Sequence, residues 1–212
     1  FDCTLETVLP GRPKPQWPVE DGCIKLKTDD LEVWINTTTG LMDKFAVKGV
    51  DILRERAFQP LVIQDDADSW STIALKYHDI AGQFAPASPE TGTRISGLEQ
   101  TIESVRVVED GPVRLVVEAV FAYGDSFLIQ TYKLPKSGTA MEVDVRVHWN
   151  EKDKMLKLAV PVVFEDAVYM GQVAYGRDVL PGAEREVVAQ KWVAAVSEQG
   201  NMALTCINDG IY

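Results

Sequence analysis

The chain has 212 residues, a formal net charge of −11, and 46% hydrophobic and 25% charged residues. This is the composition of a folded globular protein, and the length suffices for one large domain or two small ones. The negative charge argues against binding to nucleic acid, which depends on clustered Lys and Arg, and against binding to anionic membranes. No apolar run is long enough to span a bilayer. Neutral ligands, such as sugars, are compatible with this composition.

Residues 1–22 are predicted to form a linker or an extended arm. They contain the prolines Pro10, Pro13, Pro15 and Pro18, and proline discourages both helices and central strands. The first residue, Phe1, is not an initiator Met, and no signal-peptide pattern follows it. We therefore expect a segment of a longer polypeptide.

Strand patterns dominate from Cys23 onward. Residues 31–36 alternate between apolar and polar side chains, a turn follows at residues 37–40, and residues 41–47 continue the pattern, which predicts a hairpin. Residues 79–98 and 175–182 are predicted to be loops, and residues 192–198 fit either a strand or a short helix. Further strands are predicted at residues 58–63, 100–108, 113–123, 127–134, 141–150, 155–164, 168–174, 186–192 and 203–207.

The clearest pattern lies between Met141 and Asn150, where apolar and polar residues alternate without a break. Successive side chains of a strand point to opposite faces, so this pattern predicts a strand with one buried face. Strands recur every 8–12 residues or so, with turn signals between them, and no long helix is convincing. The sequence therefore predicts an all-β fold, built as a sandwich of antiparallel sheets.

Cysteine and histidine residues give no metal-binding pattern. The cysteines Cys3, Cys23 and Cys206 are odd in number and widely spaced, unlike a disulfide framework or a zinc-binding motif. We interpret them as idle thiols of a cytoplasmic protein, with a Cys3–Cys23 bridge left open. The histidines, His78 and His148, are far apart in the sequence, and His148 is predicted to be a solvated or cross-strand residue.

Several short motifs occur together, in an order known from one family. Residues 105–114 are similar to its V-V-E-x-G-P-V-R motif, residues 145–157 to V-D-W-H-E-x-H-K-x-L-K, and residues 204–209 to L-L-N-D. Shorter similarities lie at residues 68–70, 130–132, 159–161, 175–176 and 190–192. From about Lys25 onward the chain resembles glycoside hydrolase family 38, the α-mannosidases, in the β-sandwich region that follows the catalytic part.

The resemblance implies a large antiparallel supersandwich of the galactose mutarotase type over residues 23–212. It implies a parent enzyme that is a retaining, zinc-dependent α-mannosidase, with its two carboxyl groups and its zinc in a separate catalytic domain. This chain is then a non-catalytic module with no cofactor of its own, predicted to be inactive alone. Its partners would be the catalytic domain of the same polypeptide and a mannose-containing saccharide; a homo-oligomer stays open.

The resemblance also implies candidate substrate-binding residues, while no residue of this chain is predicted to be catalytic or to bind a metal. Asn208, Asp209 and Tyr212 lie where the family approaches its cleft from the β side; the alternative is a turn capped by Asx side chains. Trp70 and Asp68 are further candidates, because a ring can stack on a sugar while a carboxylate accepts hydroxyl protons. The alternative is that Trp70 anchors the sandwich.

Other functions remain open beside this one. A stand-alone carbohydrate-binding module would need exposed aromatic residues on one sheet face or loop rim, and a structural or oligomerising domain would bind no sugar. An aldose epimerase of the mutarotase fold would need a His acid and a carboxylate base in one cleft. A large exposed apolar patch on one sheet would mark the surface that docks the catalytic domain.

Overall fold

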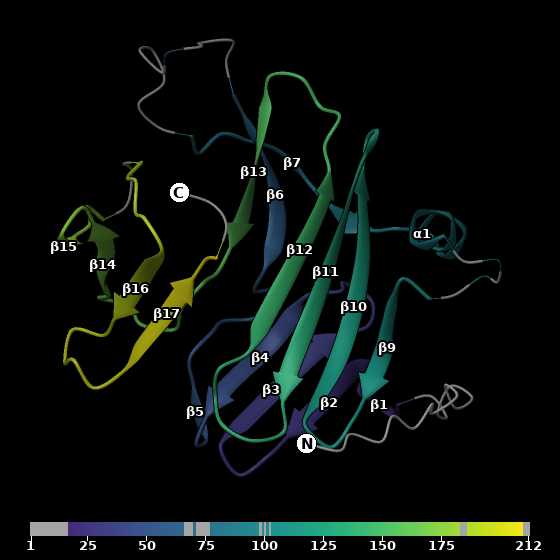
Figure 1. Ribbon diagram of the computed structural model, residues 1–212, viewed down its shortest axis with the longest axis horizontal. Helices are drawn as coiled ribbons and strands as arrows, with labels where there is room; N and C mark the ends of the chain where they lie inside the picture. Colours follow the sequence, from purple (N-terminus) through teal and green to yellow (C-terminus); the bar gives the residue numbers. More distant parts are fainter. Residues whose placement is uncertain are drawn as a thin grey trace, which may run out of the picture.

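The computed structural model of the chain describes residues 17–65, 70, 77–97, 99, 101, 103–182 and 186–209. These residues form an all-β sandwich of several antiparallel sheets, as predicted, with one short helix (Figure 1). Within them, no helix has the length and the hydropathy that a bilayer crossing requires.

The first sheet carries the predicted hairpin. Its strands follow the chain order β1 (Val19–Glu20), β2 (Cys23–Lys27), β3 (Leu31–Asn36), β4 (Met42–Val47) and β5 (Val50–Asp51). The hairpin of β3 and β4 turns at Gly40, whose φ is +70°, and a Cβ atom there would lie 2.8 Å from the ring of Phe121. The turn therefore needs glycine both for its conformation and for its close approach to the opposite sheet. Short strand β1 lies within the region predicted as an arm, and Trp17 packs against the core.

The second sheet lies across the first and closes the sandwich. Its order is β12-β11-β10-β8, with β9 also paired to β10, and its strands are β8 (Ala85–Pro86), β9 (Val105–Asp110), β10 (Arg114–Tyr123), β11 (Ser126–Pro135) and β12 (Glu142–His148). The alternating strand at 141–150 is confirmed as β12, but none of the residues of β12 is fully buried, so the predicted buried face is only partly covered. Along this face, Met141, Val143 and Trp149 pack against the core, while Val145 and Val147 are exposed.

Two buried polar side chains of β11 tie the sheets together. The hydroxyl of Tyr132 shares its one proton between the carbonyl oxygen of Gly40, at 3.0 Å, and Oε1 of Gln130, at 2.5 Å. The amide of Gln130 donates to the carbonyl oxygen of Phe58, at 2.8 Å. Both side chains are fully buried, so each of these bonds replaces hydration that the folded chain no longer has.

Two smaller sheets complete the fold. The third sheet has the order β13-β6-β7, with β6 (Gln59–Gln64), β7 (Ile80–Gln83) and β13 (Lys154–Ala159). The fourth sheet, at one side of the molecule in Figure 1, has the order β15-β14-β16-β17. Its strands are β14 (Val168–Val173), β15 (Gly176–Val179), β16 (Trp192–Val196) and β17 (Ala203–Ile207).

Predicted loops and strands differ from the structure in several regions. The strand predicted at 155–164 is β13, which ends at Ala159. Residues 79–98 are not a loop, because they form β7, β8 and helix α1 (Pro89–Ser96). The Pro and Gly residues that indicated a loop instead bracket the helix: Ser88 caps it, Pro89 opens it, and Gly97 ends it in the left-handed conformation. Residues 176–179 form β15 rather than a loop, and residues 186–191 are irregular rather than a strand.

We expect Tyr132→Phe to lower the free energy of unfolding at pH 7 by about 1–3 kcal/mol, because it leaves buried acceptors without a donor. Burial raises the pKa of Tyr132, so its stabilising effect is complete below the ordinary tyrosine pKa of about 10 and declines at higher pH. At pH 11 the difference between the wild type and the variant should therefore shrink by about 1.4 kcal/mol.

Urea unfolding of both proteins at pH 7 and pH 11 measures this difference. The matched control is Tyr175→Phe, because Tyr175 is fully exposed and should behave as wild type at both values. A difference that stays constant between pH 7 and pH 11 would contradict a buried, protonated Tyr132.

Candidate functional site

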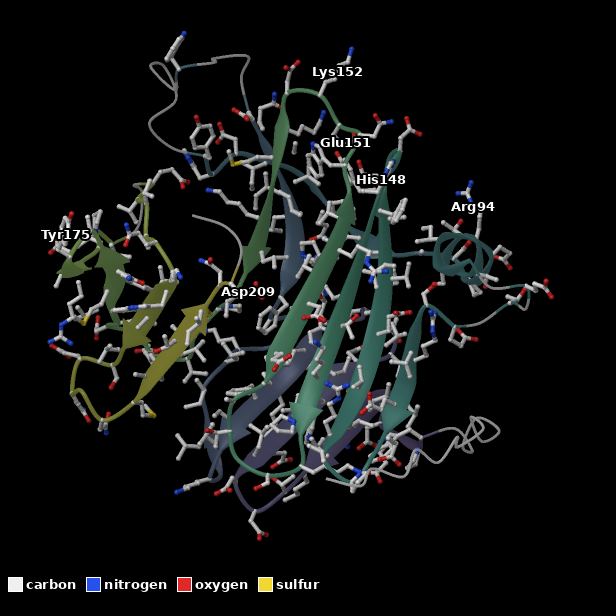
Figure 2. The ribbon with its side chains drawn as sticks, viewed as in Figure 1. Arg94, His148, Glu151, Lys152, Tyr175 and Asp209 are labelled. Atoms are coloured by element: carbon white, nitrogen blue, oxygen red, sulfur yellow. The ribbon has the colours of Figure 1, made fainter. Side chains whose placement is uncertain are left out.

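The turn after β17 carries two of the candidate substrate-binding residues. The backbone N–H of Asn208 donates to the carbonyl oxygen of Lys191, at 2.8 Å, and its side-chain amide donates to that of Gln190, at 3.1 Å. Asn208 thus holds the turn against the segment before β16. Its neighbour Asp209 is exposed, and Figure 2 shows it at the end of β17. Tyr212 lies outside the described residues.

The second pair of candidates is only half described, since Asp68 lies outside the described residues. Trp70 exposes 86% of its surface. An exposed indole ring remains suited to stacking on a flat ligand. The structure brings Asn208 and Asp209 into one turn, whereas Trp70 belongs to a segment whose neighbours on both sides are not described.

Groups that could act as metal ligands do not converge in the part of the chain that the structure describes. There, no three side chains of His, Cys, Asp or Glu are placed to hold one ion. The ring of His78 lies 3.5 Å from a carboxylate oxygen of the adjacent Asp79, and the ring of His148 stacks on Phe127. The described residues therefore do not fit a zinc ion.

Two cysteines are free thiols in sheltered positions. Cys23 is buried and Cys206 is half-buried, and burial raises the pKa of both thiols. They therefore stay protonated near neutral pH and are poor nucleophiles. This agrees with their interpretation as idle thiols, while Cys3 lies outside the described residues.

The fourth sheet carries apolar side chains on both of its faces. On one face, Ala195 and Leu204 pack against the main core. On the other, the strand register brings together the set that we call the outer apolar face, namely Val168, Met170, Val179, Trp192, Val196 and Ile207. The same register places the polar residues Gln172, Arg177 and Thr205 beside them. Of these, Val168 is 42%, Val179 61% and Ile207 77% exposed. A sheet with one face in water normally alternates apolar with polar residues, so this face is unusual for a wet surface.

A separate pocket of about 460 Å³ lies between α1 and the second sheet. Its lining includes Arg94 and Ile95 of the helix, Asp125 of the hairpin turn, and the stacked pair of Phe127 and His148. Figure 2 shows Arg94 on α1, with the strands β10 to β12 between it and Asp209. The pocket and the turn after β17 are therefore distinct places on the molecule.

Comparison with protein families identifies the family to which this β-sandwich belongs. The profile described as the glycosyl hydrolases family 38 C-terminal domain matches residues 26–212. The chain belongs to this family. A comparison of the chain with curated protein sequences finds no match.

Membership confirms the family and the region that the sequence motifs indicated. As a family 38 C-terminal domain, the chain has a catalytic domain as its partner within one polypeptide. The motif at 130–132 now has a structural explanation, because its Gln and Tyr are the buried pair that ties the sheets of this domain together. The motif at 204–209 comprises most of β17 and the turn with Asn208.

The sequence analysis did not predict the pocket of this family 38 domain, although one pair of its lining residues could have been inferred from the strand pattern. If the predicted strands at 127–134 and 141–150 pair as a hairpin centred on residues 137–138, Phe127 lies opposite His148. The structure has this register. The contributions of Arg94 and Ile95 could not be found in this way, because the helix that carries them was predicted as a loop.

We expect Asn208→Ala to lower the free energy of unfolding by about 0.5–1.5 kcal/mol, because the variant loses the bond to the carbonyl oxygen of Gln190. Asp209→Ala is the matched control: it changes the next residue, whose side chain is exposed, and should leave stability within about 0.5 kcal/mol of wild type. Urea midpoints measure both. Equal midpoints for the two variants would mean that Asn208 does not hold the turn.

Proposed function

We propose that this domain is the non-catalytic β-sandwich module of a zinc-dependent, retaining α-mannosidase. It docks the catalytic domain and contributes to the sugar cleft. Beyond family membership, the observation that carries the proposal is the outer apolar face of the fourth sheet, which combines exposed Val168, Val179 and Ile207. Contiguous apolar surface of this kind marks an interaction site on a soluble domain.

The catalytic domain is the occupant that best fits the outer apolar face. The opposite face of the same sheet already packs on the sandwich core through Ala195 and Leu204. A sheet that is largely apolar on both sides is more stable in water when a second body covers the other side. Family 38 C-terminal domains share their polypeptide with a catalytic domain, so that body is supplied by the same chain.

The proposed contribution to the cleft follows from the position of Asp209. This residue comes two positions after Ile207, which is 77% exposed on the outer apolar face. A domain seated on that face would have the turn of Asn208 and Asp209 at its border. There the exposed Asp209 carboxylate can accept hydrogen bonds from sugar hydroxyl groups, while Asn208 holds the turn through Gln190.

The chemical step is assigned to the catalytic domain. Retaining hydrolysis needs two carboxyl groups about 5–5.5 Å apart, one as nucleophile and one as acid and base. Zinc would supply electrostatic stabilisation there and would be bound by residues of that domain, since the described residues here do not fit it. We further propose a cytoplasmic location, which the free thiols of Cys23 and Cys206 support.

An assay of mannoside hydrolysis distinguishes a non-catalytic module from an enzyme. We expect the 212-residue chain to leave an aryl α-mannoside intact with or without added zinc, whereas a polypeptide that includes the catalytic domain hydrolyses it. In that longer protein, Asp209→Asn should lower kcat/KM about tenfold, in line with the loss of one charged hydrogen bond. Zinc-dependent turnover by the 212-residue chain would refute the proposal.

Docking has its own test in the longer polypeptide. We expect Ile207→Glu and Val179→Glu to separate the domains, because each places a charge in an apolar contact. The radius of gyration from small-angle X-ray scattering should then increase and mannoside turnover should fall. Val113→Glu is the matched control, since Val113 is equally exposed at 75% but lies on the second sheet beside β10. The same radius in all variants would exclude docking through this face.

A stand-alone carbohydrate-binding module is the alternative that a specific observation favours. Trp70 and Tyr175 are both highly exposed aromatic residues, as a sugar-binding loop rim requires. In that case the charge substitutions on the outer apolar face would leave the shape of the longer polypeptide unchanged, and Trp70→Ala would abolish binding of mannosides to the 212-residue chain.

A further inference from the structure

The pocket beside α1 is built from one row of side chains across the second sheet. Phe127 pairs with Ala122 on one side and with His148 on the other, so all three point to the same face. Ile95 of α1 and Ala122 both pack against the small cluster of Ala87, Val120 and Ile129, which fixes the helix on this face. Ala122 lines the hollow beside Phe127 and contributes only a methyl group to it.

The two rings form a rigid wall of that hollow. Their centroids are 4.9 Å apart and their planes are inclined by 15°, so one face of Phe127 is covered by His148. The other face of Phe127 is turned toward the strand of Ala122 and the hollow. With a volume of about 460 Å³, the hollow falls within the range of about 300–1,000 Å³ that is typical of small-molecule pockets.

Two charged groups of opposite sign stand at this pocket. The guanidinium group of Arg94 and the carboxylate of Asp125 both line it, and neither forms an ion pair with another residue that the structure describes. The hydroxyl of Ser126 is already engaged, because it donates to Glu151 at 3.0 Å and accepts from the backbone of Asn150 at 2.8 Å. Arg94 thus offers donors, and Asp125 offers acceptors, to a ligand.

We propose that this pocket binds a neutral pyranose residue, as a second carbohydrate site outside the catalytic cleft. The apolar face of a sugar ring would pack on Phe127, and its hydroxyl groups would donate to Asp125 and accept from Arg94. An anionic ligand fits less well, because Glu151 adds a second carboxylate, bonded to the backbone of Asp125 at 3.2 Å. The choice of mannose as the sugar rests on the proposed function.

The site would give the enzyme a second binding contact with a branched or extended glycan. The strands β10 to β12 separate it from Asp209 (Figure 2), so one monosaccharide cannot occupy both places. Two linked contacts on one glycan raise its effective concentration at each. The pocket would therefore favour larger mannosides over a single mannose unit, without taking part in the chemical step.

Binding is measured on the 212-residue chain with methyl α-D-mannoside as the probe, by backbone amide chemical shifts in NMR. We expect millimolar affinity, with the largest shifts at Gly124, Phe127 and His148. Phe127→Leu should raise Kd about fivefold, since it removes the flat ring and keeps an apolar side chain. Arg94→Ala should raise Kd about threefold, and it replaces an exposed residue, so the fold is preserved.

Tyr169→Leu is the control, because it removes an exposed aromatic ring from β14 of the fourth sheet, keeps an apolar side chain, and should leave Kd unchanged. Shifts confined to Asn208 and Asp209, an unchanged Kd in Phe127→Leu and Arg94→Ala, or no binding at all would overturn the pocket proposal. Tighter binding of inorganic phosphate than of the mannoside would also overturn it, in favour of an anion site. Failure of the pocket proposal leaves the proposed function standing, because that function is judged by turnover and docking in the longer polypeptide. Shifts at Asn208 and Asp209 would in addition support the proposed contribution of that turn to the cleft.

Discussion

The buried hydrogen bonds of Gln130 and Tyr132 are the constraint on which the arrangement of the sheets depends. Both side chains come from β11, and their partners are backbone oxygens of Gly40, in the β3–β4 turn, and of Phe58, next to β6. Three sheets therefore meet at one point. A hydrophobic core alone would allow the sheets to slide past one another, whereas directional bonds to backbone atoms permit one register.

Fixing the sheets in this way decides which surfaces are left for partners. The fourth sheet is held on the core by Ala195 and Leu204, which turns the apolar residues of its other face outward. On the far side of β12, α1 packs on the second sheet and leaves the pocket at Phe127. One domain thus presents an apolar face suited to a protein and an amphipathic pocket suited to a sugar, and the same packed core positions both.

Strand patterns in the sequence were sufficient for the fold class but not for every element. The alternation at 141–150 predicted β12, because a period of two depends only on neighbouring residues. The Gly and Pro residues at 79–98 were ambiguous, since the same residue types open and close both loops and helices. Of the candidate site, the turn of Asn208 could be predicted from its motif, whereas the contact partners Gln190 and Lys191 lie in a segment that was predicted as a strand.

By itself, the sequence determined that the chain is an all-β domain of family 38, because side-chain alternation and ordered motifs are local properties of the chain. Only the tertiary structure decided which apolar side chains stay exposed. Val145 and Val147 fit the buried pattern of their strand as well as Val143 does, yet they are exposed while Val143 packs against the core. Likewise, the outer apolar face and the pocket at Phe127 arise from pairings between distant segments, and exposure depends on what those segments bring alongside.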